Sequence, residues 1–216
     1  MCRVPISIAS VVALLLTVQT RGGSAMLDLD QWGAVLAEPE ARKHDVWQVR
    51  DGVLICRGEP MGYLHTKQTY TNVSVRFEWR WAPGRPPGNS GVLLRINGQP
   101  RPLPRSLEVQ LKSGDAGAIY GFHGMAVTGP ADRTFRREGH PPGGDLTGVR
   151  KQEAAEKEPG EWNTMEIELR GGTLRVRING RDVNSAEGCE VVGGPVGLQS
   201  EGGEIHFRNI VIEPLP

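Results

Sequence analysis

Residues 89–124 read NSGVLLRINGQPRPLPRSLEVQLKSGDAGAIYGFHG, and this stretch decides the fold. Gly91 to Ile96 alternates with a period of two, which is typical of a half-buried strand. Ser106 to Leu111 repeats the pattern, and its apolar positions place Glu108 and Gln110 together on the opposite face. The sequence therefore predicts a carboxylate and an amide side by side on one rigid element.

The alternation also predicts which other side chains share this polar face. Between residues 91 and 96 it places Leu93 and Arg95 opposite the core positions, which are Val92, Leu94 and Ile96. Residues 70–81 form the clearest strand, with an apolar face and a charged one that carries Arg76, Glu78 and Arg80. If neighbouring strands share a face, we expect both sets of polar residues to line one surface of a curved sheet.

Turn signals divide the rest of the chain into short strands. Asp51-Gly52, Gly171-Gly172 and Asn179-Gly180 each lie between apolar runs, as expected for hairpins. The 29 glycines and 16 prolines suit many tight turns, and no strand–helix–strand pattern occurs. These features predict an all-β sandwich of two antiparallel sheets.

Two segments fit this pattern poorly. Residues 27–40 are expected to form a connecting arm anchored by Trp32. Residues 125–159 have weak periodicity and mixed charge, with residues 145–157 either helical or loose, so we expect one long loop insertion there. The loop is either a lid over a site or a surface insertion.

Composition sets limits on the partners. The 25 basic and 25 acidic residues balance, so no nucleic-acid partner is indicated. The chain is long enough for one domain with its own core, here assigned to residues 26–216.

Residues 1–25 have the form of a secretory signal peptide, with a basic start, an apolar stretch and a small-residue exit. The alternative is an uncleaved N-terminal anchor. A cleaved signal predicts a secreted or periplasmic protein without membrane contact. Cys56 and Cys189 then form a disulfide or remain two buried thiols.

The chain from about Trp47 to Pro216 resembles the 3-keto-disaccharide hydrolase family, mostly secreted bacterial proteins with a concanavalin-like jelly roll. The resemblance follows the family's order through five stretches: Asn89-Ser90-Gly91-Val92, Leu107-Glu108-Val109-Gln110-Leu111, Gly117-Ala118-Ile119-Tyr120-Gly121, Gly160-Glu161-Trp162-Asn163-Thr164, and Gly197-Leu198-Gln199 with Phe207-Arg208-Asn209-Ile210. It implies a carbohydrate substrate and hydrolysis of 3-keto-disaccharides or 3-keto-glucosides.

A ketone at C3 of a glucosyl unit makes the C2 proton acidic, so the C1 substituent leaves by elimination and water then adds. The strand geometry and the resemblance together suggest Glu108 or His123 as the base, since an imidazole transfers protons near neutral pH. Arg95 would stabilise the enolate.

We assign substrate binding to four residues with hydrogen-bonding groups, Asn89, Ser90, Gln110 and Tyr120. Alternatives stay open for each of them. Glu108 and Gln110 would also suit the wet face of a sheet, and Asn89 and Ser90 a turn. Tyr120 would also suit packing at the rim, and His123 a solvated surface.

Other functions are weighed against this one. A non-catalytic carbohydrate-binding module would use the same face with aromatic platforms, and a structural domain would bind nothing. The five histidines and three cysteines show no metal-binding spacing, and no cofactor motif is present, so we predict neither metal nor cofactor.

Overall fold

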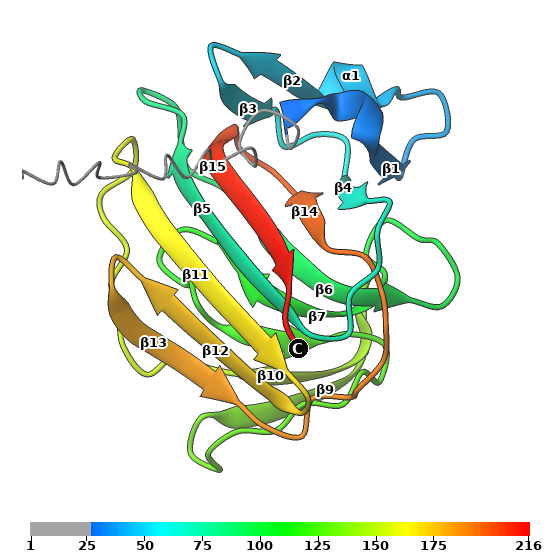
Figure 1. Cartoon of the computed structure of the whole chain (residues 1–216), viewed down its shortest axis with the longest axis vertical. Coiled ribbons are helices and arrows are strands. Elements are labelled where there is room, and N and C mark those ends of the chain that lie inside the picture. Colours follow the sequence, from blue (N-terminus) through cyan, green and yellow to red (C-terminus); the bar gives the residue numbers. More distant parts are fainter. Residues whose placement is uncertain (1–26) are drawn as a thin grey trace, which may run out of the picture.

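The computed structural model describes residues 27–216, so the predicted signal peptide lies outside the described residues. The chain forms two antiparallel sheets packed face to face (Figure 1). This confirms the predicted all-β sandwich. Among residues 27–216, the helical elements with defined bounds are the 3-10 helix η2 (Leu29–Gln31) and α1 (Lys43–Val46).

The site lies on an eight-stranded sheet. In spatial order its strands are β1 (Trp32–Leu36), β4 (Gly62–Thr66), β14 (Gly197–Ser200), β6 (Gly91–Asn97), β7 (Arg105–Gln110), β8 (Ile119–Gly121), β10 (Gly144–Val149) and β9 (Thr134–His140). The central pair sets the register, with Gly91 opposite Gln110 and Leu93 opposite Glu108.

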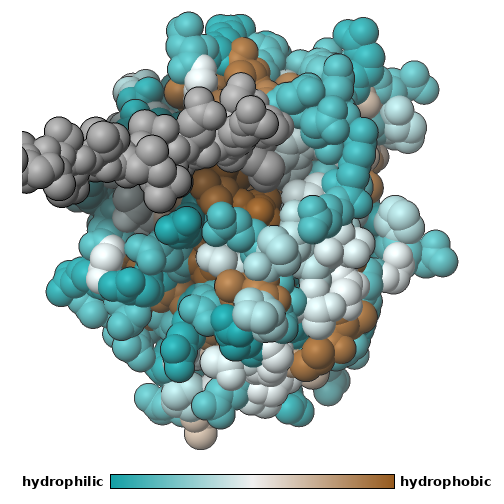
Figure 2. Space-filling view, viewed as in Figure 1, coloured by the Kyte–Doolittle hydropathy of each residue, from teal (hydrophilic) through white to brown (hydrophobic). Residues whose placement is uncertain are grey.

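The second sheet has seven strands. Their order is β13 (Arg181–Ala186), β12 (Thr173–Ile178), β11 (Asn163–Arg170), β5 (Val73–Trp81), β15 (Ile205–Pro214), β3 (Val53–Cys56) and β2 (Trp47–Arg50). Its outer face carries ion pairs such as Arg177 with Glu166 at 3.4 Å. Hydrophilic side chains prevail over β11, β12 and β13 on the face shown in Figure 2.

One continuous core fills the space between the sheets. It takes alternate residues from each central strand, such as Val92 and Leu94 from β6 and Leu107 and Val109 from β7. Trp79 joins them from β5 of the opposite sheet. Because these positions face inward, Glu108 and Gln110 project from the outer face of the eight-stranded sheet, as the alternation predicted.

Three expectations about elements are wrong. The arm at residues 27–40 contains strand β1, which pairs with β4. Residues 125–159 are not one long loop, because β9 and β10 pair there as a hairpin and β10 extends the sheet from β8. Finally, Arg76, Glu78 and Arg80 lie on β5, in the other sheet from Glu108, so the expected shared polar surface does not form.

The two cysteines in the described part of the chain, Cys56 and Cys189, are free and buried, which settles the open alternative against a disulfide. Among residues 27–216, no helix is long and apolar enough to cross a bilayer.

Candidate active site

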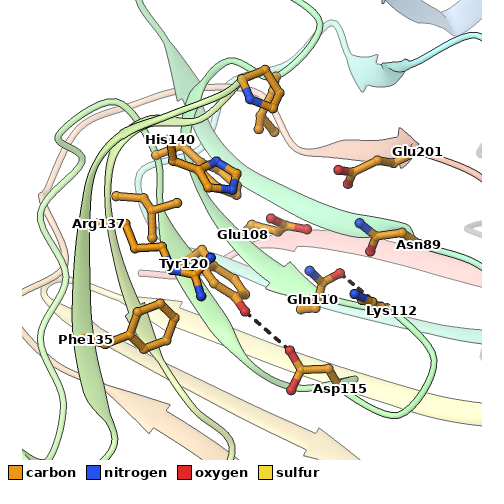
Figure 3. Close-up of a pocket in the computed structure, with 14 residues that line it drawn as sticks. Asn89, Glu108, Gln110, Lys112, Asp115, Tyr120, Phe135, Arg137, His140 and Glu201 are labelled. Atoms are coloured by element: carbon orange, nitrogen blue, oxygen red, sulfur yellow. Dashed lines mark hydrogen bonds between the residues drawn. The ribbon is translucent and has the colours of Figure 1, made fainter.

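A pocket of about 220 Å³ opens on the outer face of the eight-stranded sheet. Figure 3 shows Glu108 at its centre, with Asn89 and Glu201 on one side and Tyr120, Arg137 and His140 on the other. The walls come from β7, β8, the β9–β10 hairpin and the loops after β7 and β14. The full lining is Asn89, Leu103, Glu108, Gln110, Lys112, Asp115, Tyr120, Phe122, Phe135, Arg137, His140, Pro142, Leu146 and Glu201.

Glu108 is the most deeply buried polar residue of the pocket lining. Its side chain is 1% exposed, and its Oε1 atom has no hydrogen-bond partner. Burial raises the pKa of its carboxyl well above the usual value, and the negative charges of Glu201 and Asp115 raise it further. A buried carboxyl that lacks a cationic partner is a group suited to gaining and losing a proton.

The backbone of β6 makes room for this carboxyl. A Cβ atom at Gly91 would overlap Oε1 of Glu108, so the glutamate side chain lies directly across the glycine. Only a residue without a side chain permits this approach.

Gln110 is oriented by its own backbone. Its Oε1 accepts hydrogen bonds from the backbone N–H groups of Leu111 at 3.0 Å and Lys112 at 2.9 Å. This leaves its amide nitrogen as a donor in the pocket, on the side away from Lys112 (Figure 3).

Aromatic rings form one wall. Tyr120 lies opposite Glu108 in the β7–β8 register. Its ring is parallel to Phe122 at 5.9 Å between centroids and edge-on to Phe135 at 6.0 Å. Its hydroxyl donates to Asp115 at 3.3 Å, and burial raises its pKa, so it stays a neutral donor. Aromatic rings therefore face the interior of this pocket.

The structure brings together four of the seven predicted site residues. Glu108, Gln110, Asn89 and Tyr120 all line the pocket. Their roles in binding or catalysis stay predictions.

The other three predicted residues lie elsewhere. Arg95 is turned away by a β-bulge between Leu94 and Asn97, where its φ of 53° reverses the alternation. Its buried guanidinium donates to the backbone carbonyls of Thr71, Gly171 and Glu190. It therefore ties loops together, and the predicted enolate contact is wrong.

Ser90 and His123 also make structural contacts. The buried hydroxyl of Ser90 donates to the carbonyl of Gln199 at 2.8 Å. The Nε2 atom of His123 lies 3.0 Å from the carbonyl of Leu103, and His123 is absent from the pocket lining. The structure thus favours Glu108 of the two bases proposed from the sequence.

Sequence reasoning missed several polar side chains of the pocket. Arg137 and His140 lie in the segment expected to be a loop, and Lys112 and Glu201 each follow the end of a strand. The Nδ1 atom of His140 is buried without a hydrogen-bond partner. A useful signal would have been the position of Glu201, directly after β14 and before Gly202-Gly203, because functional side chains gather where strands of a sheet end.

Within the described residues, no group of three or more His, Cys, Asp or Glu side chains is arranged to hold a metal ion. The pocket instead offers neutral donors, acceptors and separate charges. Such groups recognise the hydroxyls of a sugar, and the aromatic wall suits the apolar face of a sugar ring.

A family model described as a 3-keto-alpha-glucoside-1,2-lyase-like domain matches residues 23–213. The chain belongs to this family. The match confirms the resemblance noted from the sequence. A comparison with curated protein sequences finds no match.

Solved structures share the fold of this lyase-like domain. A candidate glycosyl hydrolase from Parabacteroides distasonis aligns over 90% of this chain and 94% of its own, with a TM-score of 0.63 and 19% identity. The carbohydrate-binding module CBM66 from Bacillus subtilis aligns over 85% and 95%, with a TM-score of 0.62 and 11% identity.

A Bacillus licheniformis beta-glucanase is a more distant structural neighbour of the lyase-like domain. It aligns over 86% of this chain and 92% of its own, with a TM-score of 0.54 and 10% identity. Identities this low show a common concanavalin-like sandwich and leave the activity to be argued from the site.

Proposed function

We propose that the protein cleaves 3-keto-glucosides by removing the C2 proton, eliminating the C1 substituent and adding water. The observation that carries the proposal is the buried Glu108 carboxyl, whose Oε1 has no partner at the centre of a pocket of about 220 Å³. The family description, which names a 1,2-lyase-like activity on 3-keto-alpha-glucosides, supports the same chemistry.

In this mechanism the ionised Glu108 accepts the C2 proton as the enolate forms. Its raised pKa makes it a stronger base than an ordinary carboxylate, and the buried site favours its neutral product. A base whose pKa approaches the working pH transfers protons efficiently.

The enolate oxygen needs positive charge or hydrogen-bond donors, and Arg95 does not supply them. Arg137 and Lys112 are the cations of the pocket lining, and the amide nitrogen of Gln110 is a neutral donor. We assign enolate stabilisation to these three groups in place of Arg95.

Replacement of Glu108 by Gln tests the proposal. The change keeps size and removes the base, so turnover of a 3-keto-glucoside should fall about 10²- to 10⁴-fold. Glu213→Gln, an exposed change on the other sheet, is the matched control. Turnover of Glu108→Gln equal to that of the control would remove Glu108 from the mechanism.

A non-catalytic carbohydrate-binding module is the second candidate function. The aromatic wall of Tyr120, Phe122 and Phe135 favours it, because sugar rings stack on such surfaces. Binding of a plain glycan without turnover of any 3-keto-glucoside would support the module. Turnover that is lost in Glu108→Gln while binding persists would support the enzyme.

The proposal also places the protein outside the cytoplasm, in the periplasm or the medium. This part rests on residues 1–25 alone. Detection of residues 1–25 on the mature protein by N-terminal sequencing would contradict signal cleavage.

A further inference from the structure

Glu201 lies on the boundary between two hollows. Besides the pocket around Glu108, it lines a second and larger hollow of about 370 Å³. This hollow is bounded by the chain just after β1, by residues 58–61 and by the Glu201–Gly202 loop. Glu201 is the one residue that the two linings share.

Close backbone packing holds the Glu201 loop in place. The N–H of Gly202 donates to the carbonyl of Gly58 at 2.7 Å, and its carbonyl accepts from the N–H of Asn89 at 2.8 Å. A Cβ atom at Gly88 would overlap the carbonyl of Gly202. The loop therefore has little freedom to move relative to either hollow.

Hydrogen bonds from the end of β14 and from the chain after β1 hold the wall of the second hollow. The hydroxyl of Ser200 donates to the carbonyl of Pro60 at 3.0 Å, and the carbonyl of Met61 accepts from the N–H of Ala37 at 2.8 Å. The two hollows are thus built on one connected set of strand ends.

We propose that Glu201 is the catalytic acid that protonates the departing glycosidic oxygen, with the 3-keto sugar ring in the Glu108 pocket and the leaving group in the second hollow. The inference rests on the proposed function. In Figure 3 the carboxyls of Glu108 and Glu201 enter the pocket from different walls, as a separate base and acid require.

Burial supports the role of Glu201 as a proton donor. It raises the pKa of the Glu201 carboxyl, while the nearby Lys112 and the amides of Asn89 and Gln199 lower it. The net effect is a raised pKa, so the carboxyl holds its proton at a higher pH than an exposed glutamate.

The proposed step balances as follows. Glu108 takes the C2 proton and the electron pair forms the enolate. The enolate then collapses, the C1–C2 double bond forms, the C1–O bond breaks, and the departing oxygen takes the proton of Glu201. Glu108 ends protonated and Glu201 ionised. Exchange with solvent restores both, and water adds across the double bond to give the 3-keto sugar.

The lining of the second hollow indicates which leaving groups it accepts. Its lining includes the carboxylates of Glu38 and Glu59 beside the carboxyl of Glu201, and neither lysine nor arginine is among its lining residues. Pro60 and Met61 add an apolar edge. These surroundings favour a neutral or cationic leaving group over an anionic one.

Glu201→Gln separates this role from that of Glu108. With a 3-keto disaccharide, whose leaving oxygen needs a proton, kcat should fall about 10²-fold or more. With a 4-nitrophenyl 3-keto-glucoside, whose leaving group departs as an anion, the loss should stay within a few fold. Exchange of the C2 proton in D2O should persist in Glu201→Gln and disappear in Glu108→Gln.

Equal losses with both leaving groups, or loss of C2 exchange in Glu201→Gln, would overturn the assignment. Absence of both turnover and exchange in the wild type would instead overturn the proposed function. The two failures are therefore distinguishable.

A second variant tests the hollow itself. Ala37 is exposed at its edge, and Ala37→Trp adds bulk there without removing a buried group. The ratio of kcat/KM for a 3-keto disaccharide to that for methyl 3-keto-glucoside should fall at least tenfold. An unchanged ratio in a variant with the wild-type melting temperature would exclude the second hollow as the leaving-group site.

Discussion

At the scale of single residues, the position of the Glu108 carboxyl depends on the absence of a side chain at Gly91. The two residues lie on paired strands, and Oε1 occupies the place that a Cβ at residue 91 would need. Gly91→Ala should therefore displace the carboxyl. We expect kcat on a 3-keto-glucoside to fall about 10²-fold or more, which is the usual loss when a catalytic group is misplaced.

The control for Gly91→Ala is Gly180→Ala, at a turn where an added Cβ meets no atom within 4 Å. Its positive φ of 77° adds local strain but leaves the pocket untouched. Full activity of Gly91→Ala would show that Glu108 has another productive position.

The raised pKa of Glu108 also links stability to pH. The folded carboxyl has a pKa above its ordinary value of 4.5, so between the two values the folded state binds more protons than the unfolded state. The free energy of unfolding therefore falls as pH rises through this interval. Each unit of separation contributes about 1.4 kcal/mol.

Glu108→Gln removes this titration. The free energy of unfolding of Glu108→Gln minus that of the wild type should increase as the pH rises from 4 to 8. The reason is that only the wild type ionises a buried group over this range. Urea denaturation at several pH values measures the difference. A difference that is constant over this range would contradict the assignment of the raised pKa to Glu108.

At the scale of elements, period-two alternation predicts β5, β7 and the first half of β6 correctly, because each of these strands buries one face. It fails after Leu94, where the bulge moves Arg95 to the inner side and places Ile96 beside Tyr63 and Leu93 on the outer side. A bulge depends on the partner strand, and the sequence of one strand does not reveal it.

The β9–β10 hairpin escaped prediction for a different reason. β9 is an edge strand whose middle residues, Arg136 to Gly139, are exposed, so it has no apolar face to produce alternation. Its composition resembles a loop, although its backbone is fully a strand. Pocket residues on such a strand can be identified only once its pairing with the neighbouring strands is known.

This hairpin supplies a matched pair of arginines for a test. Arg137 lines the pocket, whereas the neighbouring Arg136 does not. If Arg137 stabilises the enolate, Arg137→Ala should lower kcat by about 10- to 10³-fold. The upper end of this range is the usual loss when one donor to an oxyanion is removed. Arg136→Ala should stay within twofold of wild type in the same assay. Equal effects of the two changes would show a general electrostatic influence instead of a direct contact.

At the scale of the whole molecule, strand order separates polar groups that the sequence alone would combine. Arg76, Glu78 and Glu108 all lie opposite apolar positions in their strands, yet β5 and β7 belong to different sheets. Local alternation gives the face of each strand, and long-range pairing decides which faces coincide. For that reason, the pairing of Glu108 and Gln110 within one strand was predictable. The position of Glu201 after a strand could have marked it as a candidate, but not as a neighbour of Glu108.

The sandwich also holds together without a covalent link between its parts. Cys56 lies on β3 and Cys189 in the loop before β14; both thiols are free, and burial raises the pKa of each to about 11. A disulfide would typically contribute about 2–4 kcal/mol to stability.

Because the continuous core between the sheets supplies the stability instead, the melting temperature of the chain lacking residues 1–25 should be the same with and without reductant. Thiol titration of this chain should find no rapidly reacting thiol in the native protein and two after denaturation without reductant. A melting temperature that drops by several degrees on reduction, or fewer than two thiols after denaturation, would show that the cysteines pair in solution.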